Sequence, residues 1–118
     1  MKEVSTQIEY NGKVYDLYYN LNVMVEIQAE YKTLAKWGEL TDGKSNEGEP
    51  DIKALIFGVT AMINEGIDIK NEKNGTNEPH VTQKEVGRLL TDIGLSEITE
   101  TVNDVVIESA GEDKSKNE

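Results

Sequence analysis

The sequence predicts a mainly α-helical fold of the α+β class, with an N-terminal β-hairpin followed by about four helices in a small bundle. Two observations lead to this prediction. Near the start, an Asn-Gly dipeptide separates two stretches of alternating apolar and polar residues, which is typical of a tight hairpin. Beyond it, apolar residues recur at three- and four-residue steps, and turn residues separate the segments. The length of 118 residues is typical of one domain.

The hairpin is expected over about residues 4 to 18. Asn11-Gly12 suits a type I′ turn, because both central positions of that turn need positive φ. The turn places Ile8 opposite Tyr15 and Tyr10 opposite Lys13. One face of the hairpin then carries its apolar side chains: Ile8, Tyr10, Tyr15 and Leu17.

Asn20 can cap the first helix, whose apolar positions are Leu21, Met24, Ile27, Tyr31 and Leu34. An alternative is that Thr33 ends this helix and caps a short second one that carries Leu34 and Trp37. Gly38 indicates a helix end, and a loop follows over residues 41–49.

A helix begins at about Pro50, which suits a first helical turn because its missing N–H costs nothing there. Gly58 inside this helix indicates close approach of another part of the chain. The helix ends at Gly66 or continues to about Lys70, and a polar loop follows over residues 71–79. One stripe of the helix is apolar: Ile52, Leu55, Ile56, Val59, Met62 and Ile63.

A second, smaller apolar patch lies almost opposite that stripe, where Phe57 is flanked by Ala54 and Ala61. An ordinary surface helix buries one stripe only, so this patch is a candidate partner-binding surface or homo-oligomer contact. Trp37 is a further candidate, because tryptophan anchors interfaces as well as closing small cores. The sequence leaves both alternatives open for Trp37.

The closing segment predicts two helices. Thr82 and Glu85 form a capping box, and the helix that they begin ends at Gly94. Ser96 is expected to cap the last helix, although the β-branched run at residues 105–107 would also suit a strand. Residues 1–110 are expected to form the domain, and residues 111–118 a disordered polar tail.

The net charge of −11 argues against binding to nucleic acid or to anionic membranes. No stretch is apolar enough to cross a membrane. The last helix carries a face of carboxylates, which adds to the candidate partner-binding residues: Glu97, Glu100, Asp104 and Glu108. Such a face favours solubility and could steer a basic partner.

Catalytic motifs are not found. The chain has no cysteine, and its one histidine, His80, follows a proline in a polar loop. The loop after Asp68 does not match an EF-hand, because position twelve falls on Val81 rather than glutamate. We therefore expect no enzyme activity, no cofactor and no metal.

Four blocks, taken in order, carry a family resemblance: YNGKVYDL, LNVMVEIQAEYKTLAKW, DIKALIFGVTAMINEGIDI and VTQKEVGRLLTDIGLSEITETVNDVVIES. In this order the chain resembles the tail assembly chaperones of long-tailed bacteriophages and related prophages, over about residues 7 to 109. It departs from the expected pattern at Lys32-Thr33, where a glycine and a small cap would break the first helix.

The resemblance implies a non-catalytic protein of the bacterial host cytoplasm that is absent from the mature virion. It would bind the tape measure protein and keep it soluble during tail assembly. A longer form, made by ribosomal frameshifting, would recruit the tail tube protein. This chain resembles the short form, and Lys116-Asn117 could be encoded by a slippery A-rich run.

A small acidic regulator or inhibitor of a basic protein is the alternative that composition supports equally well. Its binding should weaken steeply with salt, whereas apolar client binding should not. A carboxylate enzyme would require two acids placed across a cleft, which the sequence does not indicate.

Overall fold

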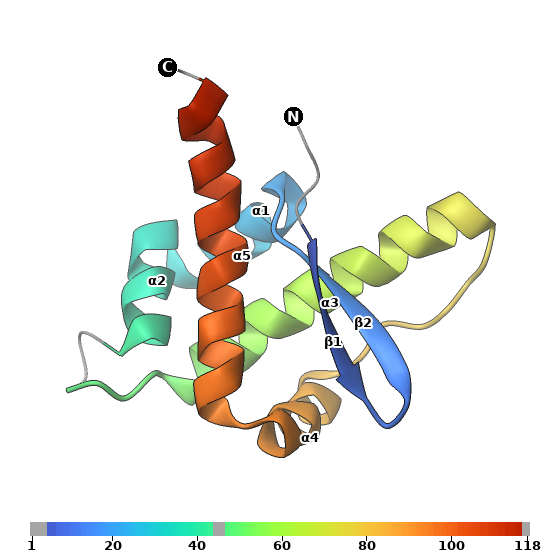
Figure 1. The fold of residues 1–118 in the computed structure, drawn as a ribbon, viewed down its shortest axis with the longest axis horizontal. Coiled ribbons are helices and arrows are strands. Elements are labelled where there is room, and N and C mark those ends of the chain that lie inside the picture. Colours follow the sequence, from blue (N-terminus) through green and yellow to red (C-terminus); the bar gives the residue numbers. More distant parts are fainter. Residues whose placement is uncertain (1–4, 44–46, 117–118) are drawn as a thin grey trace.

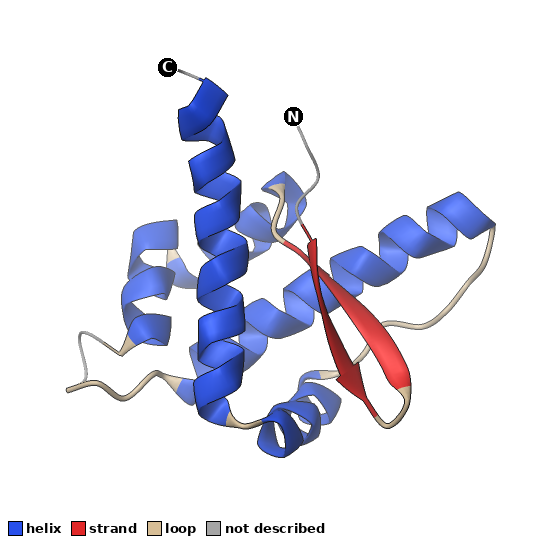
Figure 2. Cartoon of the chain, in the orientation of Figure 1, coloured by secondary structure: helices blue, strands red, loops and turns tan. Residues whose placement is uncertain are grey.

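The computed structural model describes residues 5–43 and 47–116, which form one two-stranded hairpin and five helices (Figures 1 and 2). This arrangement confirms the predicted fold class. In chain order the elements are β1 (Ser5–Tyr10), β2 (Lys13–Tyr18), α1 (Leu21–Tyr31), α2 (Leu34–Asp42), α3 (Ile52–Asn74), α4 (Gln83–Ile93) and α5 (Leu95–Lys116).

The hairpin forms in the predicted register. β1 and β2 pair antiparallel with Ile8 opposite Tyr15 and Tyr10 opposite Lys13. Both turn residues have positive φ, 54° at Asn11 and 77° at Gly12, as a type I′ turn requires. One face of the hairpin packs on α3 and into the core, and this contact gives the short sheet the support that an isolated hairpin lacks.

α3 is the central element of the fold. It passes behind the hairpin in Figure 1, and α1, α2 and α4 also pack against it. Leu55, Val59 and Met62 along it are fully buried. The helix begins after Asp51, whose side chain accepts from the Ala54 N–H, so Pro50 precedes the helix instead of opening it. Its end at Asn74 lies beyond both of the predicted ends, and Gly75, with a φ of 65°, caps it there through a hydrogen bond to the Asn71 carbonyl.

A break separates α1 from α2, which is the second of the two alternatives that the sequence left open. Asn20 caps α1 through the Val23 N–H, and Thr33 caps α2 through the Lys36 N–H. Lys32 between them has a φ of 76°, so a lysine takes the conformation for which glycine was expected. The predicted end at Gly38 is wrong, because α2 continues to Asp42 and stops at Gly43, which has a φ of 81°.

The capping box at the start of α4 is present in both directions, with Glu85 N donating to Thr82 and Thr82 N donating to Glu85. Gly94 ends α4 as predicted. Ser96 does not cap α5, because α5 begins at Leu95 and the Ile98 N–H donates to the Gly94 carbonyl at 3.1 Å.

α5 is helical throughout, which excludes the alternative of a strand at residues 105–107. It continues to Lys116, and residues 117–118 lie outside the described part of the chain. The disorder expected for residues 111–118 stays a prediction. Among the described residues, no helix has the length and apolar character needed to cross a membrane.

Candidate functional site

Trp37, left open between interface and core, belongs to the core. Only 2% of it is exposed, and its indole Nε1–H donates to the Ala54 carbonyl at 2.9 Å. Its ring stacks on Tyr19 with centroids 6.4 Å apart. A buried, hydrogen-bonded indole cannot contact a partner without a rearrangement of α2.

The predicted exposed patch around Phe57 is not formed. Ala54 is fully buried and Ala61 is 4% exposed, because α1 and α2 cover this side of α3. Phe57 itself is half-buried and meets the Tyr31 ring edge-on, with centroids 5.5 Å apart. Of the three predicted members, only Phe57 keeps accessible surface.

The carboxylate face of α5 is exposed where its side chains are described. Glu97, Glu100 and Asp104 point to solvent, while Ile98 and Val102 on the other side enter the core. The side chain of Glu108 lies outside the described residues. No described cation forms an ion pair with these three acids, so their charges are available to a partner.

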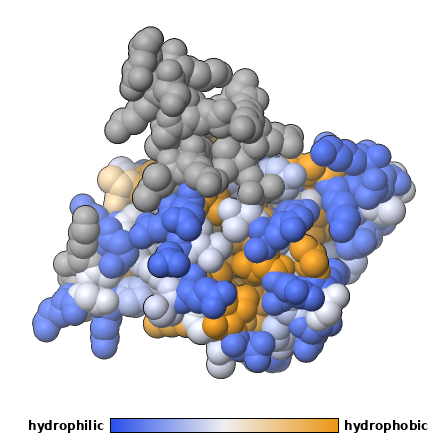
Figure 3. Space-filling model, viewed as in Figure 1, coloured by the Kyte–Doolittle hydropathy of each residue, from blue (hydrophilic) through white to orange (hydrophobic). Residues whose placement is uncertain are grey.

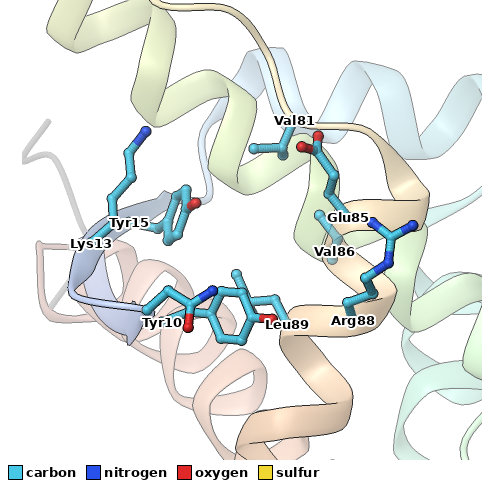
Figure 4. Close-up of a pocket in the computed structure, with 9 residues that line it drawn as sticks. Tyr10, Lys13, Tyr15, Val81, Glu85, Val86, Arg88 and Leu89 are labelled. Atoms are coloured by element: carbon cyan, nitrogen blue, oxygen red, sulfur yellow. The ribbon is translucent and has the colours of Figure 1, made fainter.

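A groove that the sequence did not predict lies between the hairpin and α4. It has a volume of about 390 Å³. Figure 4 shows its two sides, with Tyr10 and Tyr15 from the hairpin on one and residues of α4 and the preceding loop on the other. Apolar and aromatic side chains form much of its wall: Tyr10, Tyr15, Val81, Val86 and Leu89.

Charged groups border the groove on both sides. Lys13 comes from the hairpin, and Glu85 and Arg88 come from α4 (Figure 4). Figure 3 shows hydrophobic surface gathered over this part of the molecule and bordered by hydrophilic side chains. An apolar hollow with a few charged groups at its edge is the usual composition of a binding site for a side chain or small ligand.

A second exposed apolar feature lies on α1. Leu21 and Val25 stand one turn apart, 64% and 63% exposed. Of the recurring apolar positions of this helix, Ile27 is buried and Leu21 is exposed, and Val23 is the other buried residue of α1. This pair lies on a convex helix surface and forms no hollow that the structure describes.

Reactive groups do not gather within the described residues. His80 Nε2 lies 2.8 Å from Asp68 Oδ1, but both side chains are half-exposed and no nucleophile that the structure describes bonds to the histidine. No described cluster of three or more His, Asp or Glu side chains could hold a metal ion.

Sequence reasoning missed the groove because its two sides lie about seventy positions apart in the chain. The hairpin register did place Tyr10 and Tyr15 on one face, and the capping box did place Val86 in the first turn of α4. The two sides of the groove come together only because α4 packs near the hairpin in the folded chain. Comparison with protein-family models, with curated proteins and with solved structures found no match to this chain.

Proposed function

We propose that this chain is a tail assembly chaperone of a long-tailed bacteriophage or prophage. It binds the tape measure protein and keeps it soluble until the tail tube forms around it, and it does so without catalysis. It acts in the cytoplasm of the bacterial host and leaves before the virion is complete.

One observation supports this proposal: each block of the family resemblance lies mainly on helices or strands of the fold, although three of the four blocks end inside a helix. The block at the Asn-Gly turn lies on the hairpin, and the second block covers α1, the break at Lys32 and part of α2. The third block lies within α3 and its capping residue, and the last covers α4 and most of the described part of α5. The four blocks together therefore include part or all of every described helix and strand.

The surface of the molecule supports a binding role. A protein that holds an aggregation-prone client needs apolar contact area together with charge that keeps the complex in solution. The groove between the hairpin and α4 supplies the first, and the exposed acids of α5 supply the second.

Co-expression with the product of a long coiled-coil reading frame, to be sought beside the gene for this chain, tests the proposal. We expect this protein to move a tape measure protein from the insoluble to the soluble fraction and to co-purify with it. Purified virions should lack the chain by mass spectrometry. An unchanged insoluble fraction, at matched expression of both proteins, would contradict the proposal.

A longer, frameshifted product would connect this domain to the tail tube protein. Sequencing of the gene should then show a slippery A-rich run near the codons of Lys116 and Asn117 and an overlapping reading frame. Pull-down with the tail tube protein should require the extension and not the domain alone.

The acidic face of α5 favours a second candidate, a regulator that binds one basic protein. Glu97, Glu100 and Asp104 are exposed together on it. Raising the salt concentration separates the two functions, because charge pairing at an exposed surface is screened and apolar binding is not. Steep loss of partner binding with salt would favour the regulator.

A further inference from the structure

We infer that the groove between the hairpin and α4 binds a peptide segment in which an apolar side chain is flanked by carboxylates. This inference rests on the proposed function, because it identifies the groove as the place where the client is held. It specifies both the gripping surface and the chemistry of the segment that fits it.

The walls define the apolar part of the ligand. Tyr10 and Tyr15 point from the hairpin toward the hollow (Figure 4), and Val86 and Leu89 of α4, which are only 1% and 3% exposed, line it opposite them. Tyrosine offers a large contact area with little loss of side-chain freedom, which is why it is common at binding surfaces. A volume of about 390 Å³ has room for one large side chain and part of its neighbours.

The rim defines the charge of the ligand. Arg88 is exposed and forms no hydrogen bond or ion pair with another described residue. Lys13, on the other side, has only a long contact of 3.8 Å with Glu78 and lies 5.4 Å from the centre of the Tyr15 ring. Two cations therefore border the groove on a chain whose net charge is −11.

The one acid of the rim is already engaged. The Oε1 atom of Glu85 accepts the Thr82 N–H at 2.8 Å in the capping box, which holds this carboxylate at the start of α4. A carboxylate of the ligand would find the Arg88 guanidinium unpaired, and arginine binds carboxylates through two parallel hydrogen bonds. The capping hydrogen bond does not cancel the negative charge of Glu85, and Lys13 lies near Glu78, so the preference for a carboxylate on the ligand rests on the unpaired Arg88 guanidinium.

Three short synthetic peptides, capped at both ends, test this chemistry. The first carries the sequence Glu-Phe-Glu between glycines, the second Gln-Phe-Gln and the third Glu-Ala-Glu. In NMR titrations of the ¹⁵N-labelled full chain at low salt, we expect the first to shift amides of residues that line the groove. The other two should bind at least fivefold more weakly.

Matched variants test the rim. Arg88→Glu should weaken the Glu-Phe-Glu peptide at least fivefold, and Arg88→Gln should weaken it less. Lys53→Glu makes the same change of charge at another exposed helical position and should stay within twofold of the original chain. Circular dichroism and thermal unfolding check that each variant folds.

Three results would overturn the inference. If the Gln-Phe-Gln peptide binds as tightly as the Glu-Phe-Glu peptide, the carboxylates of the ligand make no contribution to binding. Amide shifts centred on Leu21 and Val25 would place the site on α1. If the amide signals of groove residues shift with protein concentration in the absence of peptide, a second copy of the chain is the occupant of the groove.

The client experiment separates this inference from the proposed function. Arg88→Glu should lower the soluble yield of a co-expressed tape measure protein, while Lys53→Glu should leave it unchanged. If the original chain fails to solubilise the client, the proposed function fails, and the peptide titration still decides what the groove binds. If Arg88→Glu solubilises the client as well as the original chain does, the client is held elsewhere and the inference is wrong.

Discussion

The indole ring of Trp37 in α2 lies directly against the backbone of Gly58 in α3, with no α3 side chain at that position to separate them. A β-carbon at position 58 would overlap the Cζ2 atom of the ring and come within 2.8 Å of Cε2. The ring is also fixed by its hydrogen bond to the Ala54 carbonyl, one turn earlier in α3. The absence of a side chain at Gly58 thus makes room for the Trp37 ring, and this offsets the low helix propensity of glycine.

Gly58→Ala should therefore destabilise the fold. Alanine is favoured over glycine in a helix by about 1 kcal/mol, but overpacking of a core typically costs about 1–3 kcal/mol. Because the ring cannot move without losing its hydrogen bond, we expect a net loss in the free energy of unfolding. Urea unfolding followed by the fluorescence of Trp37, the one tryptophan of the chain, measures it.

Gly38→Ala is the matched control, since Gly38 lies inside α2 and nothing stands within 4 Å of a β-carbon placed there. It should stabilise the protein by up to about 1 kcal/mol. Equal effects of the two substitutions would show that the Trp37 ring yields easily and that the contact with Gly58 is not restrictive.

The capping box offers a second prediction, because it fixes the start of the helix that forms one side of the groove. Thr82→Ala removes the acceptor of the Glu85 N–H and should cost about 1 kcal/mol of unfolding free energy. Thermal and urea unfolding measure the loss. Hydrogen exchange at the first amides of α4 should rise more than elsewhere.

Thr91→Ala makes the same chemical change in the same helix without touching a cap. The Thr91 hydroxyl is exposed and donates to the Gly87 carbonyl within α4. Alanine there should be neutral or slightly stabilising, within about 0.5 kcal/mol. A loss as large as that of Thr82→Ala would mean that α4 is sensitive to any change of threonine and that the cap has no special role.

Local signals predicted the local structure well. The Asn11-Gly12 turn set the hairpin register, and Thr33 and Thr82 marked helix starts, because each acts through backbone groups within three or four residues. The close approach at Gly58 was also indicated. The residue that makes the approach, Trp37, was not, since α2 and α3 meet only through the tertiary fold.

The wrong predictions share one physical cause. Tertiary packing can override the local sequence signals for helix ends and exposed faces. Gly38 was taken as a helix end, but Trp37 and Thr41 on either side of it are buried, and this packing holds the helix past the glycine. Ala54 and Ala61 were assigned to the surface, because one helix alone cannot show that α1 and α2 cover two of its sides. The groove, built from β1, β2 and α4, is a product of packing in the same way.

A third prediction concerns alkaline pH. Burial raises the pKa of Tyr19 above its ordinary value of 10.0, because the neutral phenol is favoured beside the Trp37 ring. Burial also raises the pKa of Tyr31, with further contributions from the carboxylates of Asp51 and Glu30. Raised values mean that the unfolded chain loses these protons first.

The stabilisation from Tyr19 is therefore complete below about pH 10 and is lost as the pH rises through the pKa of the folded state. The urea midpoint should therefore fall as the pH rises above about 10. Tyr19→Phe cannot ionise and should reduce that fall, whereas Tyr18→Phe, at the neighbouring and more exposed position, should leave it nearly unchanged. An equally steep fall in Tyr19→Phe would assign the alkaline loss to Tyr31 or to the growing negative charge of the whole chain, and Tyr31→Phe in the same assay would separate these two causes.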